Sequence, residues 1–242
     1  MSRLQPSAPR VIAHRGASGA LPENTLPSFA LAVEQRADMI EVDLHTTRDG
    51  EVVIRHDAEL ETLGGVGEIG ETALADIRRL DAGGGQAVPT LDEMLDGFCE
   101  AIPFNLELKV GARGRYPGME GVAVAAVERR GVLAETLFSS FYEDVLQALR
   151  ACGEGVRIAV LVSERWPAGM LERARRLGAE AINPFYRLVD REMVDRAHGE
   201  GMTVYPYTVD DLAEVDRLVG LGVDGLFTNY PDRMRSWVDE RF

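Results

Sequence analysis

Short apolar runs alternate along the chain with longer segments in which apolar residues recur at helical spacing. Short runs of this kind are typical of buried β-strands, and the longer periodic segments are typical of amphipathic helices. The expected strands are residues 11–13, 39–43, 104–108, 137–140, 157–162, 181–183, 203–207 and 225–227. The expected helices are residues 25–35, 91–99, 121–130, 143–150, 170–177, 191–198 and 212–221.

Strands that alternate with helices predict a parallel sheet. Eight such strands in a chain of 242 residues favour a closed (β/α)8 TIM barrel, a fold that commonly reaches this length as one domain. A doubly wound open sheet is the alternative, but the chain lacks the Gly-x-Gly-x-x-Gly loop that often follows the first strand of such a sheet. We therefore predict an α/β protein with a single TIM-barrel domain over residues 1–242.

Residues 51–55 form a further strand-like run that breaks the alternation, because only residues 44–50 separate it from the second strand, residues 39–43. A parallel return needs a dozen or more residues, so this run must form an antiparallel hairpin. Asp49-Gly50 is a favoured two-residue turn. With that turn, His45 would face Ile54, and Asp43 would face His56.

Residues 58–88 are rich in glycine and too long for a simple strand-to-helix loop. We interpret them as a small insertion after the second strand, with a short helix at residues 73–80. Just beyond it, Thr90 and Glu93 have the spacing of a capping box for the helix that follows.

The net charge and the cysteine content indicate which binding partners and which cellular compartment to expect. Lys and Arg number 26 and Asp and Glu number 40, giving a formal net charge of 26 − 40 = −14, which argues against nucleic acid or an anionic membrane as the main partner. No apolar run approaches the ~18 residues that span a membrane. The first ten residues lack the apolar core of an export signal. Cys99 and Cys152 match no metal-binding spacing, so we expect a reducing, cytoplasmic environment.

Three acidic residues stand at the ends of expected barrel strands, where active sites of this fold lie. Glu41 and Asp43 are two positions apart and point to the same side of one strand. Glu107 is likewise an acidic residue near the end of the next parallel strand. Carboxylates without a thiol favour a hard divalent cation, Mg²⁺ or Ca²⁺. The alternative is a set of acids paired with basic residues at a solvated rim.

Two histidines flank this acidic group in the expected fold. His14 follows the first strand directly, and the hairpin returns His56 to the mouth of the barrel. We interpret them as a general acid and base pair, with metal ligation as the alternative. His45 lies two residues beyond Asp43 and is expected at the rim, and His198 is expected to interact with the end of its own helix.

Further polar residues near the first strand suit an anionic substrate. Arg15 is followed by Gly16, and arginine binds phosphate in a bidentate manner, although a salt bridge at the rim is the alternative. Glu23 and Asn24 precede a helix. They are expected either to begin that helix or to contact the substrate and support its neighbours.

The order of these motifs resembles the glycerophosphodiester phosphodiesterases. The resemblance rests on AHRGASGALPENTLPSF, DMIEVDLHTTRDGEVVIRHD, FNLELK, SSF at residues 139–141 and GLFTNYPD at residues 225–232. It covers about residues 11 to 232, nearly the whole chain. The family fold is a (β/α)8 barrel with a small insertion after the second strand, in agreement with the pattern above.

The resemblance also implies roles for individual residues. Glu41, Asp43 and Glu107 would hold one divalent cation, and His14 and His56 would be the general acid and base. Arg15 and Lys109 would contact the phosphate. The implied reaction is cleavage of a small-molecule glycerophosphodiester to glycerol 3-phosphate and an alcohol. Tyr207 stands where the family usually has tryptophan, and its ring could still stack on the glycerol moiety.

Two other functions stay open on the sequence alone. A lysophospholipase D-type enzyme would use the same chemistry on lysolipids, and a non-catalytic barrel would only bind phosphate esters. The attacking group could be water or the neighbouring glycerol hydroxyl. Lys109 is also the only lysine beside 25 arginines. A base composition that favours arginine codons is one explanation, and a specific need for an ammonium group at position 109 is the other.

Overall fold

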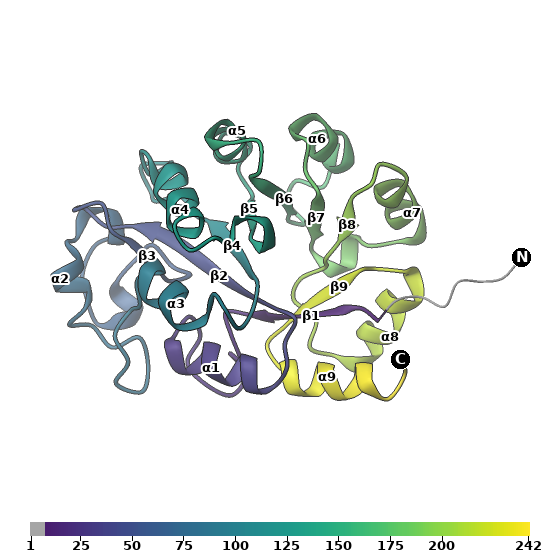
Figure 1. Cartoon of the computed structure of the whole chain (residues 1–242), viewed down its shortest axis with the longest axis horizontal. Coiled ribbons are helices and arrows are strands. Elements are labelled where there is room, and N and C mark those ends of the chain that lie inside the picture. The colour runs from purple at the N-terminus through teal and green to yellow at the C-terminus, as the bar shows by residue number, and fades with distance from the viewer. Residues whose placement is uncertain (1–7) are drawn as a thin grey trace, which may run out of the picture.

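The computed structural model describes residues 8–242. Residues 1–7 lie outside the described residues; the predicted domain and the segment tested for an export signal both begin there. Within residues 8–242, nine strands form one sheet in the order β8-β7-β6-β5-β4-β2-β1-β9, with β3 paired to β2 (Figure 1). The strands are β1 (Arg10–His14), β2 (Met39–Thr46), β3 (Val52–Ile54), β4 (Phe104–Leu108), β5 (Leu137–Ser140), β6 (Arg157–Val162), β7 (Ala181–Pro184), β8 (Thr203–Val204) and β9 (Gly225–Thr228). All neighbours pair in parallel except β2 and β3.

The segments after β8 and along β9 bring the two ends of this sheet together. The amide of Asp224 donates to the carbonyl of Val204 at 3.0 Å, and the amide of Phe227 donates to the carbonyl of Pro206 at 3.0 Å. The expected strand 203–207 is regular only over Thr203–Val204, because Pro206 has no amide hydrogen to donate to a sheet. The predicted (β/α)8 barrel is confirmed.

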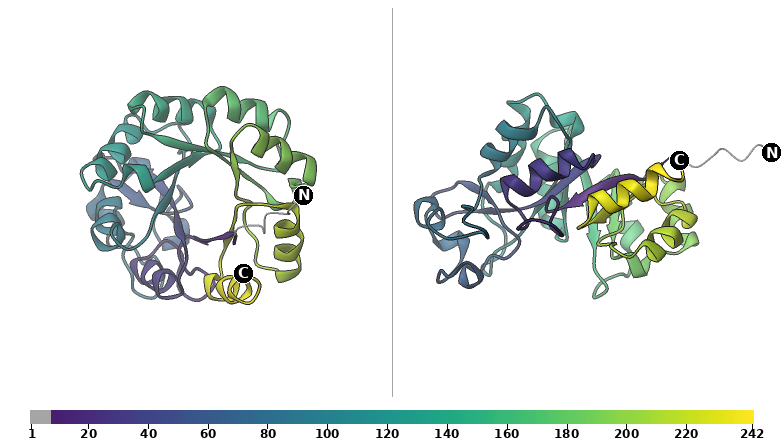
Figure 2. Two further views of the ribbon diagram at one scale, coloured as in Figure 1. Left: turned by 45° about the vertical axis from the view of Figure 1, so that its right-hand side comes forward. Right: turned by 90° about the horizontal axis from the view of Figure 1, so that it is seen from below.

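Helices cover the outside of the barrel, as the view along it shows (Figure 2). They are α1 (Leu26–Glu34), α2 (Leu74–Ile77), α3 (Leu91–Phe98), α4 (Met119–Glu128), α5 (Glu143–Cys152), α6 (Met170–Leu177), α7 (Arg191–Gly199), α8 (Leu212–Leu221) and α9 (Pro231–Asp239). The predicted capping box of α3 is present, with Thr90 and Glu93 each bonded to the backbone of the other. Helix α9 was not predicted, although Pro231 at its start is a recognised helix-initiating residue.

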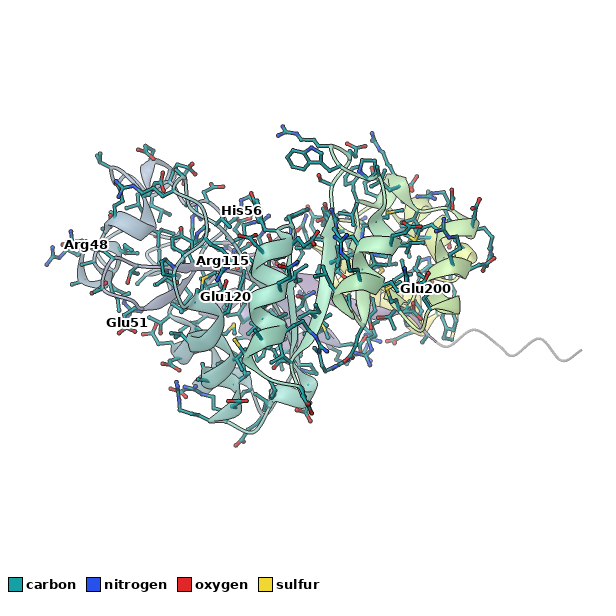
Figure 3. All side chains as sticks on the ribbon, turned by 90° about the horizontal axis from the view of Figure 1, so that it is seen from above. Arg48, Glu51, His56, Arg115, Glu120 and Glu200 are labelled. Carbon is teal, nitrogen blue, oxygen red and sulfur yellow. The ribbon has the colours of Figure 1, made fainter. Side chains whose placement is uncertain are left out.

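The β2–β3 hairpin forms, but its register is shifted by one residue from the prediction. Leu44 faces Ile54 and His45 faces Val53. The loop has three residues, because the amide of Thr47 donates to the carbonyl of Glu51 at 2.9 Å and Gly50 adopts a left-handed φ of 89°. Figure 3 shows Arg48 and Glu51 near this loop at one edge of the molecule, with His56 set inward from them.

The segment 58–88 folds beside the hairpin as two 3-10 turns, Glu61–Leu63 and Ile69–Glu71, followed by the single-turn helix α2. The helix expected at residues 73–80 is therefore shorter than predicted. A small apolar cluster anchors the segment to β3; it contains Val53, Leu60, Ile69, Ile77, Ala82 and Val88.

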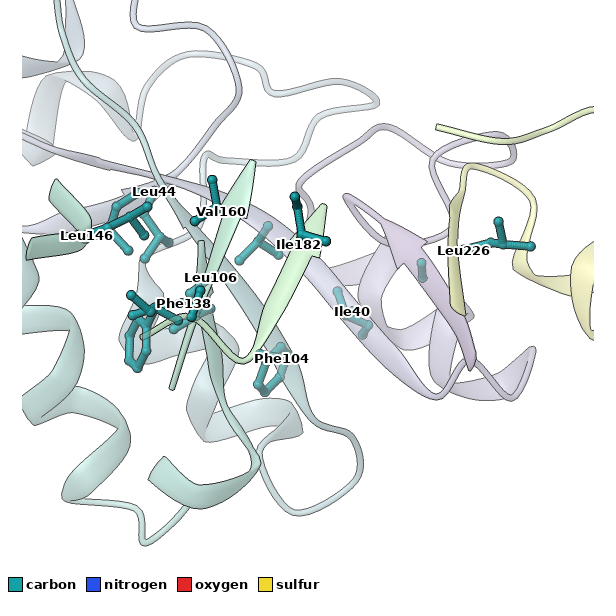
Figure 4. Packing of buried hydrophobic residues seen from close by; sticks show 14 of the residues in the cluster. Ile40, Leu44, Phe104, Leu106, Phe138, Leu146, Val160, Ile182 and Leu226 are labelled. Atoms are coloured by element: carbon teal, nitrogen blue, oxygen red, sulfur yellow. The ribbon is translucent and has the colours of Figure 1, made fainter. Parts of the chain in front are cut away.

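Alternate residues along each strand face the helices or the barrel interior. The outward set includes Ile40, Leu44, Phe104, Leu106 and Phe138, which pack under the helices (Figure 4). The inward set forms a separate apolar layer of Ile12, Met39, Leu137, Ala159, Ala181, Tyr205 and Phe227. Because side chains alternate, His14, Glu41, Asp43 and Glu107 continue the inward rows toward the carboxyl ends of their strands.

Candidate active site

A cavity of about 290 Å³ opens at the carboxyl ends of the barrel strands. One part of its wall is charged and comes from β1, β2, β4 and the end of the hairpin: His14, Arg15, Glu41, His56, Glu107 and Lys109. The opposite part is mainly apolar and comes from the later strands: Phe141, Leu161, Phe185, Tyr207 and Phe227. A ligand in this cavity would therefore meet a polar, charged surface on one side and aromatic rings on the other.

The three predicted carboxylates converge at the charged side. Asp43 pairs in register with Glu107 across β2 and β4, and Glu41 lies one inward step earlier on β2. One oxygen from each carboxylate lies within 4.8 Å of the others, and the three residues are at most 8 % exposed. Burying three acids so close together requires positive charge nearby.

Two cations supply part of that charge. The Nζ atom of Lys109 lies 2.9 Å from Oε1 of Glu107 and 3.1 Å from Oδ1 of Asp43. On the other side, Nε of Arg15 lies 3.2 Å from Oδ2 of Asp43. Asp43 is thus held between an ammonium and a guanidinium group.

The pKa values of the three acids shift in different directions in this environment. Burial, with Asp43 and Glu107 nearby, raises the pKa of Glu41 well above its ordinary value. Burial likewise raises the pKa of Glu107. For Asp43, burial acts upward, but Lys109 and Arg15 outweigh it and lower the pKa below the ordinary value. The two cations therefore favour ionisation of Asp43 but only partly offset the cost of burying Glu41 and Glu107.

A divalent cation would offset more of this cost. The residues offer three carboxylates and no thiol, which is the ligand chemistry of Mg²⁺ and Ca²⁺. An additional positive charge among the oxygens would lower the raised pKa values of Glu41 and Glu107. The donor set and its electrostatics both match the predicted cation site.

His14 occupies the wall next to the carboxylates. Its Nδ1 lies 2.8 Å from Oδ1 of Asn229, and its Nε2 lies 3.9 Å from Oε2 of Glu41. Burial and the neighbouring Arg15 lower the pKa of His14 to about 4, so the imidazole is neutral near neutral pH.

His56 approaches the same cavity from the end of the hairpin. Its Nδ1 lies 2.8 Å from Oδ1 of Asp57, and its side chain is 37 % exposed. An ionised carboxylate can only accept, so Nδ1 carries the hydrogen and Nε2 is left without a protein partner in the described residues. Burial and Lys109 lower the pKa of His56.

Glu23 and Asn24 lie behind the cavity wall and support it. Both carboxylate oxygens of Glu23 accept from Nη1 of Arg15, at 3.1 and 3.0 Å. Nδ2 of Asn24 donates to Oδ2 of Asp43 at 2.9 Å. Arg15 and Asn24 both adopt left-handed φ angles, 58° and 56°, so this loop is held in a backbone conformation that such residues seldom adopt.

Tyr207 lies in the apolar wall, as expected from its place after β8, the seventh barrel strand. Its hydroxyl donates to the carbonyl of Val162 at 3.0 Å. Its ring meets Phe141, Phe185 and Phe227 edge to face, with centroids 6.0 to 6.5 Å apart. The ring is therefore held in place in the wall of the cavity.

His45 is buried instead of standing at the rim. Its Nδ1 lies 2.8 Å from the hydroxyl of Tyr116, and its Nε2 lies 3.1 Å from the carbonyl oxygen of His56. Tyr116, from the segment between β4 and α4, packs edge to face against the imidazole, with ring centroids 5.5 Å apart. His45 thus anchors the backbone at His56.

Sequence reasoning did not single out Asn229, the partner of His14, or Asp210, which binds Asn229. The amide Nδ2 of Asn229 donates to Oδ2 of Asp210 at 2.7 Å. The only local signal was the family-like GLFTNYPD segment, which contains Asn229.

Comparison with known proteins agrees with this geometry. The sequence profile of the glycerophosphoryl diester phosphodiesterase family matches residues 14–233. A glycerophosphodiester phosphodiesterase of Bacillus subtilis is 33% identical, over 95% of this chain and 86% of the relative. Another, from Caldanaerobacter subterraneus, is 32% identical over 94% of this chain and 97% of the relative.

Solved structures show the same fold. A phosphodiesterase of Oleispira antarctica, in complex with the product sn-glycerol-3-phosphate, is 31% identical with a TM-score of 0.83, covering 96% of this chain and 97% of that one. A protein of Silicibacter pomeroyi described as a putative glycerophosphoryl diester phosphodiesterase is 28% identical with a TM-score of 0.88, covering 98% and 95%. Among the described helices, none combines the length and apolar character of a membrane span.

Proposed function

Because the chain belongs to the glycerophosphoryl diester phosphodiesterase family, we propose that it hydrolyses glycerophosphodiesters to glycerol 3-phosphate and an alcohol in a reaction that needs a divalent cation. Two carboxylates, Glu41 and Glu107, line one cavity together with two cations and two histidines, and Asp43 offers an oxygen within 4.8 Å of theirs; this convergence carries the proposal. The product bound to the Oleispira antarctica protein, sn-glycerol-3-phosphate, supports a small-molecule substrate of this class.

The charges of the site suit a phosphodiester. Glu41, Asp43 and Glu107 contribute three negative charges when ionised, and Arg15 and Lys109 contribute two positive ones. A bound Mg²⁺ or Ca²⁺ would supply Lewis-acid stabilisation of the charge that grows on phosphate oxygens. With that cation the group carries one net positive charge, which complements the single negative charge of the substrate. Arg15 and Lys109 donate hydrogen bonds to the remaining phosphate oxygens.

The two histidines move the protons. Each has its Nδ1 engaged by a neighbour, His14 by Asn229 and His56 by Asp57, so each is held in place while its Nε2 is free to exchange a proton. One histidine, as the neutral ring, accepts a proton on Nε2 from the attacking oxygen. The other enters the step as an imidazolium, with a proton on Nε2 as well as on Nδ1, and donates the Nε2 proton to the leaving alkoxide. Near neutral pH an alkoxide leaves poorly without that proton.

The aromatic wall orients the rest of the substrate. Tyr207 offers a flat apolar surface to the glycerol moiety, opposite the charged side that holds the phosphate. Glu23 and Asn24 contribute by fixing Arg15 and Asp43.

We assign this reaction to one catalytic domain, residues 1–242, with the segment 58–88 as an insertion. We place it in the cytoplasm, which the absence of a disulfide between the two described cysteines supports. The substrate would come from phospholipid breakdown, and the high negative charge speaks against nucleic acid as a partner.

A coupled assay of glycerol 3-phosphate release tests this function. Purified protein is given glycerophosphodiesters with several headgroups and, in parallel, a lysophospholipid. We expect release of glycerol 3-phosphate from the glycerophosphodiesters, little turnover of the lysophospholipid, and loss of release in His14→Ala.

His198→Ala is the matched control, because His198 lies on α7 and pairs with Asp224 outside the cavity, so its loss leaves the site intact. Turnover of the lysophospholipid alone would favour the lysophospholipase D-type function. Binding of glycerophosphodiesters without any turnover would favour a non-catalytic barrel.

A further inference from the structure

A chain of hydrogen bonds runs from the cavity to the loop after β8. His14 at the end of β1 contacts Asn229 just after β9, with Nδ1 and Oδ1 2.8 Å apart. Asn229 contacts Asp210 through Nδ2 and Oδ2, 2.7 Å apart. Asp210 does not line the cavity. Three barrel loops that are distant in the sequence are therefore connected through these side chains.

Asp210 determines which way the Asn229 amide points. An ionised carboxylate only accepts hydrogen bonds, so the Asn229 atom that faces it must be the NH₂ group. Asp210 is itself fixed, because its Oδ1 accepts from the Asn229 backbone amide at 2.8 Å and from the Thr228 hydroxyl at 3.0 Å. The carbonyl oxygen of the Asn229 side chain must then point to His14.

This orientation determines the tautomer of His14. A carbonyl oxygen 2.8 Å from Nδ1 requires the hydrogen on Nδ1, so in the neutral ring the lone pair lies on Nε2. Nε2 is the nitrogen on the side of Glu41 and the carboxylate cluster. We propose that Asn229 and Asp210 are positioning residues that hold His14 in the Nδ1–H tautomer, with Nε2 presented to the substrate.

The consequence for activity rests on the proposed function, in which His14 exchanges a proton through Nε2. The tautomer itself is a property of the folded protein and can be observed without substrate. The two parts of the proposal can therefore be tested separately.

Asp210→Asn is the most informative single change. The new amide keeps an oxygen for the Asn229 backbone amide and the Thr228 hydroxyl, and so turns its NH₂ toward the NH₂ of Asn229. Rotation of the Asn229 amide relieves this donor–donor contact but presents NH₂ to Nδ1 of His14. The neutral ring then needs its hydrogen on Nε2. A wrong histidine tautomer lowers kcat by about 10⁴ in serine proteases; here we expect a loss of at least about tenfold in kcat with little change in KM.

The double variant Asp210→Asn/Asn229→Asp exchanges the two groups and restores the pairing. The carboxylate now at position 229 accepts from His14, and the amide now at position 210 donates to it while still accepting from Thr228. We expect this double variant to regain most of the kcat that Asp210→Asn loses. A residue with only a general structural role would not be rescued in this way.

Asp211→Asn is the matched control. It makes the same charge change one residue further on, and the side chain of Asp211 caps α8 by accepting from the amide of Ala213. Asparagine caps a helix as well as aspartate does, so this variant should keep wild-type kcat, KM and melting temperature.

The deciding measurement is long-range ¹H–¹⁵N NMR of the histidine rings at a pH above the ordinary histidine pKa. The signals of His14 are those that disappear from the spectrum of His14→Ala. We expect the Nδ1–H form in the wild type and the double variant, and the Nε2–H form in Asp210→Asn. An unchanged tautomer in Asp210→Asn would overturn the proposal. So would a folded double variant, shown by a wild-type melting temperature, that fails to regain kcat. If the wild type lacks phosphodiesterase activity but shows these tautomers, the proposed function fails and the positioning role stands.

Discussion

Replacing Lys109 separates the need for positive charge from the need for an ammonium group. Its Nζ contacts Glu107 at 2.9 Å and Asp43 at 3.1 Å, and its side chain is only 17 % exposed. Breaking a buried ion pair by removing one partner costs about 3–5 kcal/mol. In Lys109→Met, Arg15 remains beside Asp43, and Glu107 can take up a proton. We therefore expect the free energy of unfolding of the metal-free variant to fall by about 3 kcal/mol, the low end of this range. For a chain of this size that corresponds to a melting temperature lower by about 6–12 °C.

Lys109→Arg keeps the charge and should leave the melting temperature close to that of the wild type. The wider, planar guanidinium cannot take the place of a compact ammonium between Glu107 and Asp43 without moving one of them. We expect kcat/KM to fall by at least about tenfold in Lys109→Arg. In Lys109→Met it should fall by about 10²–10³, the cost of losing one preorganised charged donor.

The assay is glycerol 3-phosphate release for kcat/KM, beside a circular-dichroism melt of each variant. Arg48→Lys is a matched control, because Arg48 lies in the exposed hairpin loop (Figure 3) and its exchange should change neither quantity. Wild-type kinetics in Lys109→Arg would refute the reasoning and show that any positive charge suffices at position 109.

Three further predictions concern the histidines, the cation site and a helix cap. His14→Ala and His56→Ala should each lower kcat by at least ~10², and a nitrophenolate leaving group should rescue only the variant that has lost the acid; near wild-type turnover in either would remove that residue from the mechanism. Asp43→Asn should weaken cation binding, measured by titration calorimetry, with the circular-dichroism spectrum unchanged, and equal affinity would count against the cluster as the site. Thr90→Ala should cost about 1 kcal/mol in urea unfolding, because it removes the hydroxyl that accepts from the Glu93 amide; an unchanged unfolding midpoint would show that the cap is dispensable.

The fold was largely predictable because each strand and helix is encoded by its own local pattern. The family, the fold class and the enzyme class predicted from the sequence are confirmed. The hairpin was predicted as well, but its register depended on whether two or three residues form the loop. Asp49-Gly50 favours the shorter loop, whereas Gly50 in fact adopts the left-handed conformation that closes the three-residue one.

The convergence of site residues was predictable because parallel strands end at one face of the barrel. Glu41, Asp43 and Glu107 meet there, as expected. The contact between His14 and Asn229 joins residues 215 positions apart, and no local spacing in one sequence indicates it. The burial of His45 depends on Tyr116 from a distant loop, so it too could not be derived from the local pattern.

The requirement for a divalent cation is the central claim, and glycerol 3-phosphate release before and after metal removal tests it most directly. The protein is treated with excess chelator, checked for residual metal by elemental analysis, and assayed with and without added Mg²⁺ or Ca²⁺. We predict that release stops in the metal-free protein and returns when one of these ions is added. Full activity in excess chelator, with no metal retained by the protein, would contradict the account.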